Sequence, residues 1–347
     1  MTPPDKPATL VLGGGLMGLA VAHQLARHGE NVTVISRRRS EAAGFVAAGM
    51  LAPHAEGLSG DLLKLGQASL ERIPRWVAQI EGDSGLSCGL RTSGIVVPFR
   101  TAAERDAYPT ASLGQTLGRT ALEREIPGLG PAWSTGLLFE QDGQIDNRRQ
   151  LMRALERACV SLGVQFMEGA EVLDLERESA GQLCGIHLRS AEGEQQQLRC
   201  QQAVLCSGAW SQQLVPQLPV FPVKGQMLSL QGPREALKRV IFGPGTYLVP
   251  REDGLIVVGP PANGTPDLLK GSRPMARNNC RRASPACCQQ RPTGLRWSVG
   301  GGSGPAHPMK APCSALVRYL ASGWPVDITA MAFCLPPSRL SSRPAAS

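Results

Sequence analysis

The glycine pattern Gly13–Gly18, with glycine at its first, third and sixth positions, most constrains how this chain can fold. It follows the apolar run Thr9–Leu12, which predicts a buried parallel strand, and it opens Leu16–His28, whose apolar spacing predicts a helix. The first glycine permits a tight turn, the second lets a phosphate approach the backbone, and the third allows helix and strand to pack closely. With a second strand predicted at Val32–Ile35, this start of the chain predicts a dinucleotide-binding β-α-β unit.

The second strand ends in a hydroxyl, although such strands usually end in an acidic residue that binds the ribose. Ser36 can still form a hydrogen bond with a ribose, and Arg37 follows it directly. Because basic residues at this place can accommodate a 2′-phosphate, NADPH remains an alternative cofactor. For Arg38 and Arg39 we favour a solvated basic loop.

Further helices are expected at Leu62–Ile80 and Asn147–Leu162, each from its apolar spacing. Strands are expected at Arg91–Phe99, Val164–Phe166, Val172–Leu175, Gly185–Leu188, Gln202–Cys206, Gln226–Leu230, Thr246–Pro250 and Leu255–Val258. The chain up to Gly259 therefore predicts an α/β protein with two sheets. We find no signal peptide and no apolar stretch of spanning length, so we expect a cytoplasmic protein without a membrane contact.

The basic charge of the chain is confined to its end. The net charge is +8, but residues 260–347 hold eleven Lys and Arg against two acids, and residues 1–259 hold 25 against 26. A basic end of this kind is typical of proteins that bind nucleic acid, which we keep as an alternative. The cysteines show no zinc-like spacing, so we expect no metal site.

The segment Ala47–Pro53, read together with Gly13–Gly18, resembles the D-amino-acid-oxidase-like FAD family, and within it the thiamine-pathway glycine oxidases. The resemblance covers residues 8–259. Its further matching segments are Arg91–Gly94, Asp142–Asp146, Cys206–Ser211, Pro222–Gln226 and Tyr247–Arg251.

The resemblance implies FAD as cofactor and assigns roles to particular residues. Those implied to contact FAD are Gly13, Gly14, Gly15, Met17, Gly18, Ser36, Arg37, Ala47, Ala48, Gly49, Met50, Val172, Ser207 and Gly208. Tyr247 and Met50 are implied to line the substrate and flavin pocket, with a buried core aromatic as the alternative for Tyr247.

The resemblance also implies the chemistry of an amine oxidase. An amino acid is held by its carboxylate on an arginine, and hydride passes from its α-carbon to flavin N5. The resulting imine hydrolyses to a 2-oxo acid, and dioxygen reoxidises the flavin with release of hydrogen peroxide. The expected partners are a small amino acid and dioxygen, with no nucleic acid, and intact relatives are expected to be homo-oligomers.

The resemblance stops after Gly259, because the family's late Gly-Leu-Arg-Pro and His-Tyr-Arg-Asn-Gly segments are absent as written. When this part of the chain is back-translated and each codon is read from its third base, the degenerate positions allow both segments. In that frame four dipeptides leave no choice of residue, and each forced residue fits the family. Trp324-Pro325 gives Ala, Met331-Ala332 gives Gly, Phe333-Cys334 gives Leu and Met309-Lys310 gives Glu. We therefore predict a frameshift near Gly259, and a tail that lacks the pattern of a folded protein.

The predicted architecture is a Rossmann-like FAD-binding domain and a substrate domain of antiparallel sheet. We assign residues 1–85 and 145–215 to the first domain, 86–144 and 216–259 to the second, and 260–347 to an aberrant, poorly ordered basic tail. The predicted activity is oxidation of glycine or a small amine, impaired in the chain as written. The alternatives are a related dehydrogenase of D-amino acids or sarcosine, and an inactive remnant.

Overall fold

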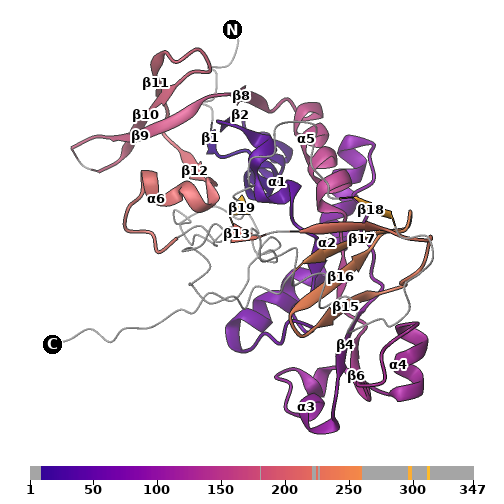
Figure 1. Ribbon diagram of the computed structural model, residues 1–347. Helices are drawn as coiled ribbons and strands as arrows, with labels where there is room; N and C mark the ends of the chain where they lie inside the picture. Colours follow the sequence, from indigo (N-terminus) through magenta and orange to yellow (C-terminus); the bar gives the residue numbers. More distant parts are fainter. Residues whose placement is uncertain are drawn as a thin grey trace, which may run out of the picture.

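The computed structural model describes residues 9–179, 181–220, 224–225, 227–259, 296–298 and 311–312. It contains a parallel sheet with its helices and a larger sheet, and the chain passes between the two several times (Figure 1). The prediction that residues 260–347 are poorly ordered falls outside the described residues, apart from two short strands at 296–298 and 311–312.

The parallel sheet forms the predicted dinucleotide-binding unit. Its strand order is β12-β1-β2-β8, and all three pairings are parallel. The strands are β1 (Thr9–Leu12), β2 (Val32–Ser36), β8 (Gln165–Glu168) and β12 (Ala203–Leu205). The pairing of β1 with β2 continues past the end of β1, because the Gly13 amide donates to the Ile35 carbonyl over 2.9 Å. The loops that follow β1, β2 and β12 therefore gather at one edge of the sheet.

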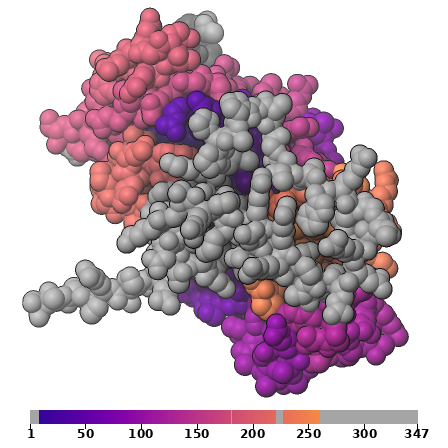
Figure 2. Space-filling view, in the orientation of Figure 1, coloured from indigo at the N-terminus to yellow at the C-terminus, as the bar shows by residue number. Residues whose placement is uncertain are grey.

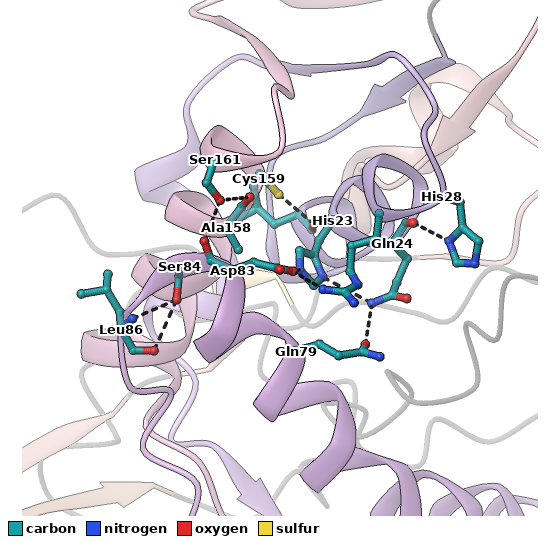
Figure 3. Close-up of polar contacts among 12 residues, drawn as sticks. His23, Gln24, His28, Gln79, Asp83, Ser84, Leu86, Ala158, Cys159 and Ser161 are labelled. Carbon is teal, nitrogen blue, oxygen red and sulfur yellow. Dashed lines mark hydrogen bonds and ion pairs between the residues drawn. The ribbon is translucent and has the colours of Figure 1, made fainter.

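Three helices pack into one core with this sheet. They are α1 (Leu16–Arg27), α2 (Gly60–Ser84) and α5 (Met152–Ser161). Polar contacts join them: the Cys159 thiol donates to the Leu19 carbonyl over 3.3 Å, and the Ser161 hydroxyl donates to the Asp83 carbonyl over 2.7 Å (Figure 3). The helix expected at Asn147–Leu162 begins as a π-helical turn, Asn147–Leu151, before α5.

The larger sheet has the order β18-β14-β17-β16-β15-β4-β6-β5. Its strands are β4 (Ile95–Phe99), β5 (Gln115–Gly118), β6 (Thr135–Phe139), β14 (Leu228–Gln231), β15 (Val240–Gly243), β16 (Thr246–Pro250), β17 (Leu255–Gly259) and β18 (Arg296–Ser298). The predicted antiparallel sheet is confirmed, except that β15 pairs with β4 in parallel. The short helices α3 (Ala102–Asp106) and α4 (Arg119–Glu125) lie at its far end (Figure 1).

A third, antiparallel sheet packs its buried face against the parallel one. It consists of β9 (Glu171–Arg177), β10 (Leu183–Arg189) and β11 (Gln195–Arg199). Ile186 and Leu188 of β10 share a buried cluster with Leu12 of β1. This sheet and the helices α3 and α4 form opposite ends of the molecule (Figure 2).

The remaining elements are short. Two strand pairs join β3 (Met50–Leu51) with β7 (Gly143–Gln144) and β13 (Lys224–Gly225) with β19 (Ala311–Pro312), and α6 spans Ser211–Leu214. The domain boundaries given above remain a proposal. The β3–β7 pair joins the segment that follows the dinucleotide-binding unit to the chain that follows β6 of the large sheet.

Candidate active site

The glycine loop lies at the carboxyl edge of the parallel sheet, and its glycines differ in how much space lies beside their α-carbons. A side chain at Gly18 would collide with the Gly13 carbonyl oxygen, so Gly18 is required by the packing of the protein itself. Among the residues that the structure describes, a Cβ at Gly15 would meet only the Cβ of Ala42, at 3.5 Å. The space beside Gly15 therefore fits a diphosphate group that approaches the backbone.

The helix that follows this loop can also accept an anion. Gly15 is the N-cap of α1 and has no side chain with which to cap the first amides of the helix. Met17 lies in this first turn and is partly buried. The other face of the loop is covered, because a Cβ at Gly14 would lie 2.6 Å from Cγ of Arg39.

The arginines that follow β2 are paired with glutamate carboxylates. Ser36 is buried at the strand end, and its carbonyl accepts a hydrogen bond from the Gly169 amide over 2.8 Å. The Arg37 guanidinium pairs with Glu171 at 3.1 Å and lies over the Trp210 ring, 5.6 Å from its centroid.

The prediction of a solvated basic loop holds for one of the next two arginines and is wrong for the other. Arg38 is exposed and pairs with Glu41 at 2.5 Å. Arg39 is only 19% exposed, because its guanidinium pairs with Glu156 at 3.1 Å and Glu168 at 2.6 Å. Carboxylates thus already match all three arginines, which favours an unphosphorylated ribose and therefore FAD over NADPH.

Two further predicted cofactor residues follow β12 at the same edge. The Ser207 hydroxyl lies 3.1 Å from that of Ser211, and Gly208 has a φ of 55°. Val172 lies elsewhere: it pairs with Leu188 in the third sheet and packs against the cluster that covers β1 and β2. The cofactor contacts of these residues remain predictions.

The segment Ala47–Met50, which the family resemblance predicts to lie beside the flavin, is held tightly by the chain around Gln144. Gly49 has a φ of 79°, its carbonyl accepts from the Ile145 amide over 2.8 Å, and a Cβ there would collide with the Ile145 carbonyl oxygen. Met50 pairs with Gln144 in the β3–β7 ladder. Only glycine therefore allows residues 47–50 to lie this close to β7.

Arg251 also holds this segment, a role that the sequence did not reveal. Its Nη2 donates to the Ala48 carbonyl over 2.5 Å, and its Nη1 donates to Oε1 of Gln144 over 2.6 Å. Its Nε lies 3.7 Å from a carboxylate oxygen of Asp146. Burial lowers the pKa of Arg251, while Asp146 opposes that shift. Among the described residues, no hydrogen-bond partner exists for Arg251 Nε or Gln144 Nε2, so two buried donors are left beside the flavin segment.

The two predicted pocket residues, Tyr247 and Met50, belong to the same apolar cluster. Tyr247 is 6% exposed, and its hydroxyl donates to the sulfur of Met227 over 3.1 Å. Met50 is partly buried against the cluster, which also contains Ala48 of the flavin segment. The structure therefore brings β16 of the large sheet to the residues that follow the dinucleotide-binding unit.

A buried polar network supports the end of the same segment. Nδ1 of His54 lies 2.6 Å from one carboxylate oxygen of Asp142, and the Ala55 amide donates to the other over 2.7 Å. Burial raises the pKa of Asp142, against the opposing effect of these hydrogen bonds. Burial, followed by the charge of Asp142, also raises the pKa of Glu56 to about 7. Sequence reasoning named Asp142 only as part of a matching segment.

Some of the expected features lie outside the described residues. The two late arginine segments that a shifted reading frame allows, within 300–310 and 323–337, fall there. Within the described residues, no group of His, Cys, Asp and Glu is arranged to hold a metal ion. No helix in that part of the chain is long and apolar enough to cross a membrane.

Comparison with known proteins agrees with this geometry. The chain is 40% identical over 258 residues to the bifunctional protein ThiO/ThiG of Synechocystis, which covers 72% of this chain and 38% of that relative. The chain thus spans less than two fifths of that relative's length. It is 30% identical over 262 residues to a glycine oxidase of Bacillus licheniformis, with 72% and 68% covered.

The fold is shared with solved structures. The crystal structure of glycine oxidase from Geobacillus kaustophilus matches with a TM-score of 0.72 and 23% identity, over 84% of this chain and 81% of that one. A family model described as FAD dependent oxidoreductase matches residues 9–305. This chain therefore belongs to the family of FAD-dependent oxidoreductases that includes the glycine oxidases.

Proposed function

We propose that this chain derives from an enzyme that oxidises glycine or another small amine to an imine and then a 2-oxo acid, with release of hydrogen peroxide, in thiamine biosynthesis. The observation that supports this most is the position of Ala47–Met50. These residues are held between the dinucleotide-binding unit and the apolar cluster of Tyr247. The names of the relatives, ThiO/ThiG and glycine oxidase, point to the same substrate and pathway.

The residues present fit FAD, which when bound supplies the hydride acceptor. The open space at Gly15 fits its diphosphate, and the buried donors of Gln144 and Arg251 lie next to the segment proposed to line its ring. We propose that the buried Tyr247 and the half-buried Met50, which pack in one apolar cluster, form a wall of large side chains on the substrate side. Such a wall favours an amine with a small side chain or none.

We further propose that the chain as written performs this reaction poorly. Hydride transfer needs a substrate held in one orientation, and the family holds its carboxylate with an arginine in a late segment. That segment is absent from residues 260–347 as written, whereas the degenerate codons of these residues allow it in the shifted reading frame. A frameshift near Gly259 accounts for both the missing arginine and the basic charge confined to the end.

Two proteins test the proposal: the chain as written, and a version in which residues from 260 onward are translated in the shifted frame. Each is loaded with FAD and mixed with glycine without oxygen, and flavin absorbance is followed. We expect fast reduction in the reframed protein and reduction at least about a hundredfold slower in the chain as written. Equal rates would overturn the impairment, and no reduction by glycine or sarcosine in either protein would overturn the proposed function. Peroxide formed on admitting oxygen distinguishes an oxidase from a dehydrogenase.

A further inference from the structure

We propose that Arg251 is a positioning residue for the flavin, which sets the Ala47–Met50 segment in place through the Ala48 carbonyl. This rests on the proposed function only in taking residues 47–50 to line the cofactor. Arg251 follows β16 of the large sheet, whereas Ala48 follows the dinucleotide-binding unit, 203 residues earlier. One guanidinium thus connects the substrate side of the molecule to the cofactor side.

The contacts of Arg251 act as a fork. Nη2 donates to the Ala48 carbonyl over 2.5 Å, while Nη1 donates to Gln144 Oε1 over 2.6 Å. Gln144 is itself paired with Met50, so one contact of the fork ends on the Ala47–Met50 segment and the other on the strand that pairs with it. A planar guanidinium suits this task because its donors have fixed relative directions, whereas a lysine ammonium binds as a single point.

Burial makes these contacts costly to lose. Arg251 is 6% exposed and Gln144 is fully buried, so an acceptor that loses the guanidinium cannot turn to water. The Ala48 carbonyl would then be left without its donor, and the peptide at Ala48–Gly49 would lose the side-chain contact that helps to fix its orientation. The nearest carboxylate, that of Asp146, lies 3.7 Å from Nε and offsets part of the buried charge.

The backbone of the arginine is fixed independently, which separates its side-chain role from the fold of the hairpin. The Arg251 amide donates to the Leu255 carbonyl over 2.7 Å, and the Gly254 amide donates to the Arg251 carbonyl over 3.1 Å. These bonds close the turn between β16 and β17 and do not involve the guanidinium. A substitution at 251 can therefore preserve the turn while it releases Ala48.

The test compares Arg251→Met with Arg239→Met in the full chain. Arg239 is a matched control, because its guanidinium also joins a carboxylate, Glu125 at 2.7 Å, and a backbone carbonyl, that of Ser93, but it touches no part of residues 47–50. In the protein without FAD, amide hydrogen exchange is measured at Ala48, Gly49 and Met50. We expect Arg251→Met to raise it about tenfold or more and Arg239→Met to leave it unchanged.

A second readout uses FAD itself. Titration followed by flavin fluorescence is expected to give an affinity about tenfold or more weaker in Arg251→Met, with a changed circular dichroism band of the bound flavin. Arg251→Lys should restore part of both, because one of the two contacts can be kept. If Arg251→Met does not fold, Arg251→Lys decides by the same two readouts.

The proposal is overturned if hydrogen exchange at residues 48–50 in the Arg251 variants equals that in Arg239→Met. It is also overturned if FAD affinity and the flavin band are unchanged in Arg251→Lys and Arg251→Met. Failure of the proposed function looks different: the unsubstituted and reframed proteins would then both fail to be reduced by amines, while the exchange comparison would still give its answer.

Discussion

Nδ1 of His54 lies 2.6 Å from Oδ1 of Asp142, a buried contact between residues 88 positions apart. His54 is 3% exposed and Asp142 is fully buried. The contact attaches the end of the proposed flavin segment to the turn between β6 and β7. Asp142 also accepts from the Ala55 amide, so one carboxylate satisfies a side chain and a backbone group of the same loop.

Replacing Asp142 should therefore destabilise the protein strongly. We expect Asp142→Ala to lower the free energy of unfolding by about 3 kcal/mol, because His54 and the Ala55 amide both lose a buried acceptor. Asp142→Asn, which keeps one acceptor oxygen, should cost about half as much. Urea unfolding of the three proteins measures the difference, and a loss below about 1 kcal/mol in Asp142→Ala would contradict this role.

The glycine loop allows folding and cofactor binding to be separated. Gly18→Ala should reduce stability by about 2–4 kcal/mol, because its Cβ would collide with the Gly13 carbonyl oxygen. Gly15→Ala should leave thermal unfolding of the cofactor-free protein nearly unchanged, because its Cβ would make ordinary contact with the Cβ of Ala42 at 3.5 Å. The same substitution should weaken FAD binding about tenfold or more, since it fills space proposed for the diphosphate. Unchanged FAD affinity in Gly15→Ala would count against this place for the diphosphate.

His23 should make the protein less stable in mild acid. It is fully buried on α1 beside Asp83 of α2, at 2.8 Å (Figure 3), and burial lowers its pKa from 6.5 despite that carboxylate. Because the unfolded chain binds the proton more readily, this stability is present above about pH 6.5 and is lost as the pH falls towards the lowered pKa. Unfolding free energies across that range should fall with a smaller slope in His23→Gln. An identical slope in both proteins would exclude His23 as the source.

Glu56 should act in the opposite direction. Its pKa is raised from 4.5 to about 7 by burial first and then by Asp142. Because the folded chain holds this proton more tightly than the unfolded chain, the contribution of Glu56 to the free energy of unfolding is fully present below about pH 4.5. It is lost as the pH rises through about 7. Glu56→Gln should therefore be more stable than the unsubstituted protein at about pH 8.5, by about 1–3 kcal/mol, and not at about pH 4.5. A uniform effect at both values, measured by urea unfolding, would contradict this.

Sequence patterns predicted local structure well where the signal was periodic. The glycine loop with β1, α1 and β2 lies within a residue of its predicted bounds, because apolar runs and glycines mark both ends. Strand β6 was missed although all five of its residues are buried, since its three large apolar residues in a row carry no alternation. The strand expected from Arg91 begins only at Ile95, because Arg91 makes a single isolated bridge to Gln144.

The candidate site was predictable in its residues and not in its supports. Glycines and the segment Ala47–Met50 could be assigned because they match a short local pattern. Arg251 and Asp142 could not, because their roles depend on partners 203 and 88 residues away and on burial, which no local pattern encodes. The charge partners of Arg39, Glu156 and Glu168, are likewise tertiary, which explains why a solvated loop was the wrong prediction.

The central claim, that this chain is built to bind FAD, is tested most directly by titrating the cofactor-free full chain with FAD and, separately, with NADPH. We expect saturable binding of one FAD per chain, weakened by Gly15→Ala, and no comparable binding of NADPH, because Arg37, Arg38 and Arg39 are already paired with carboxylates. Preferential binding of NADPH, or no binding of FAD by a chain that unfolds cooperatively, would contradict it.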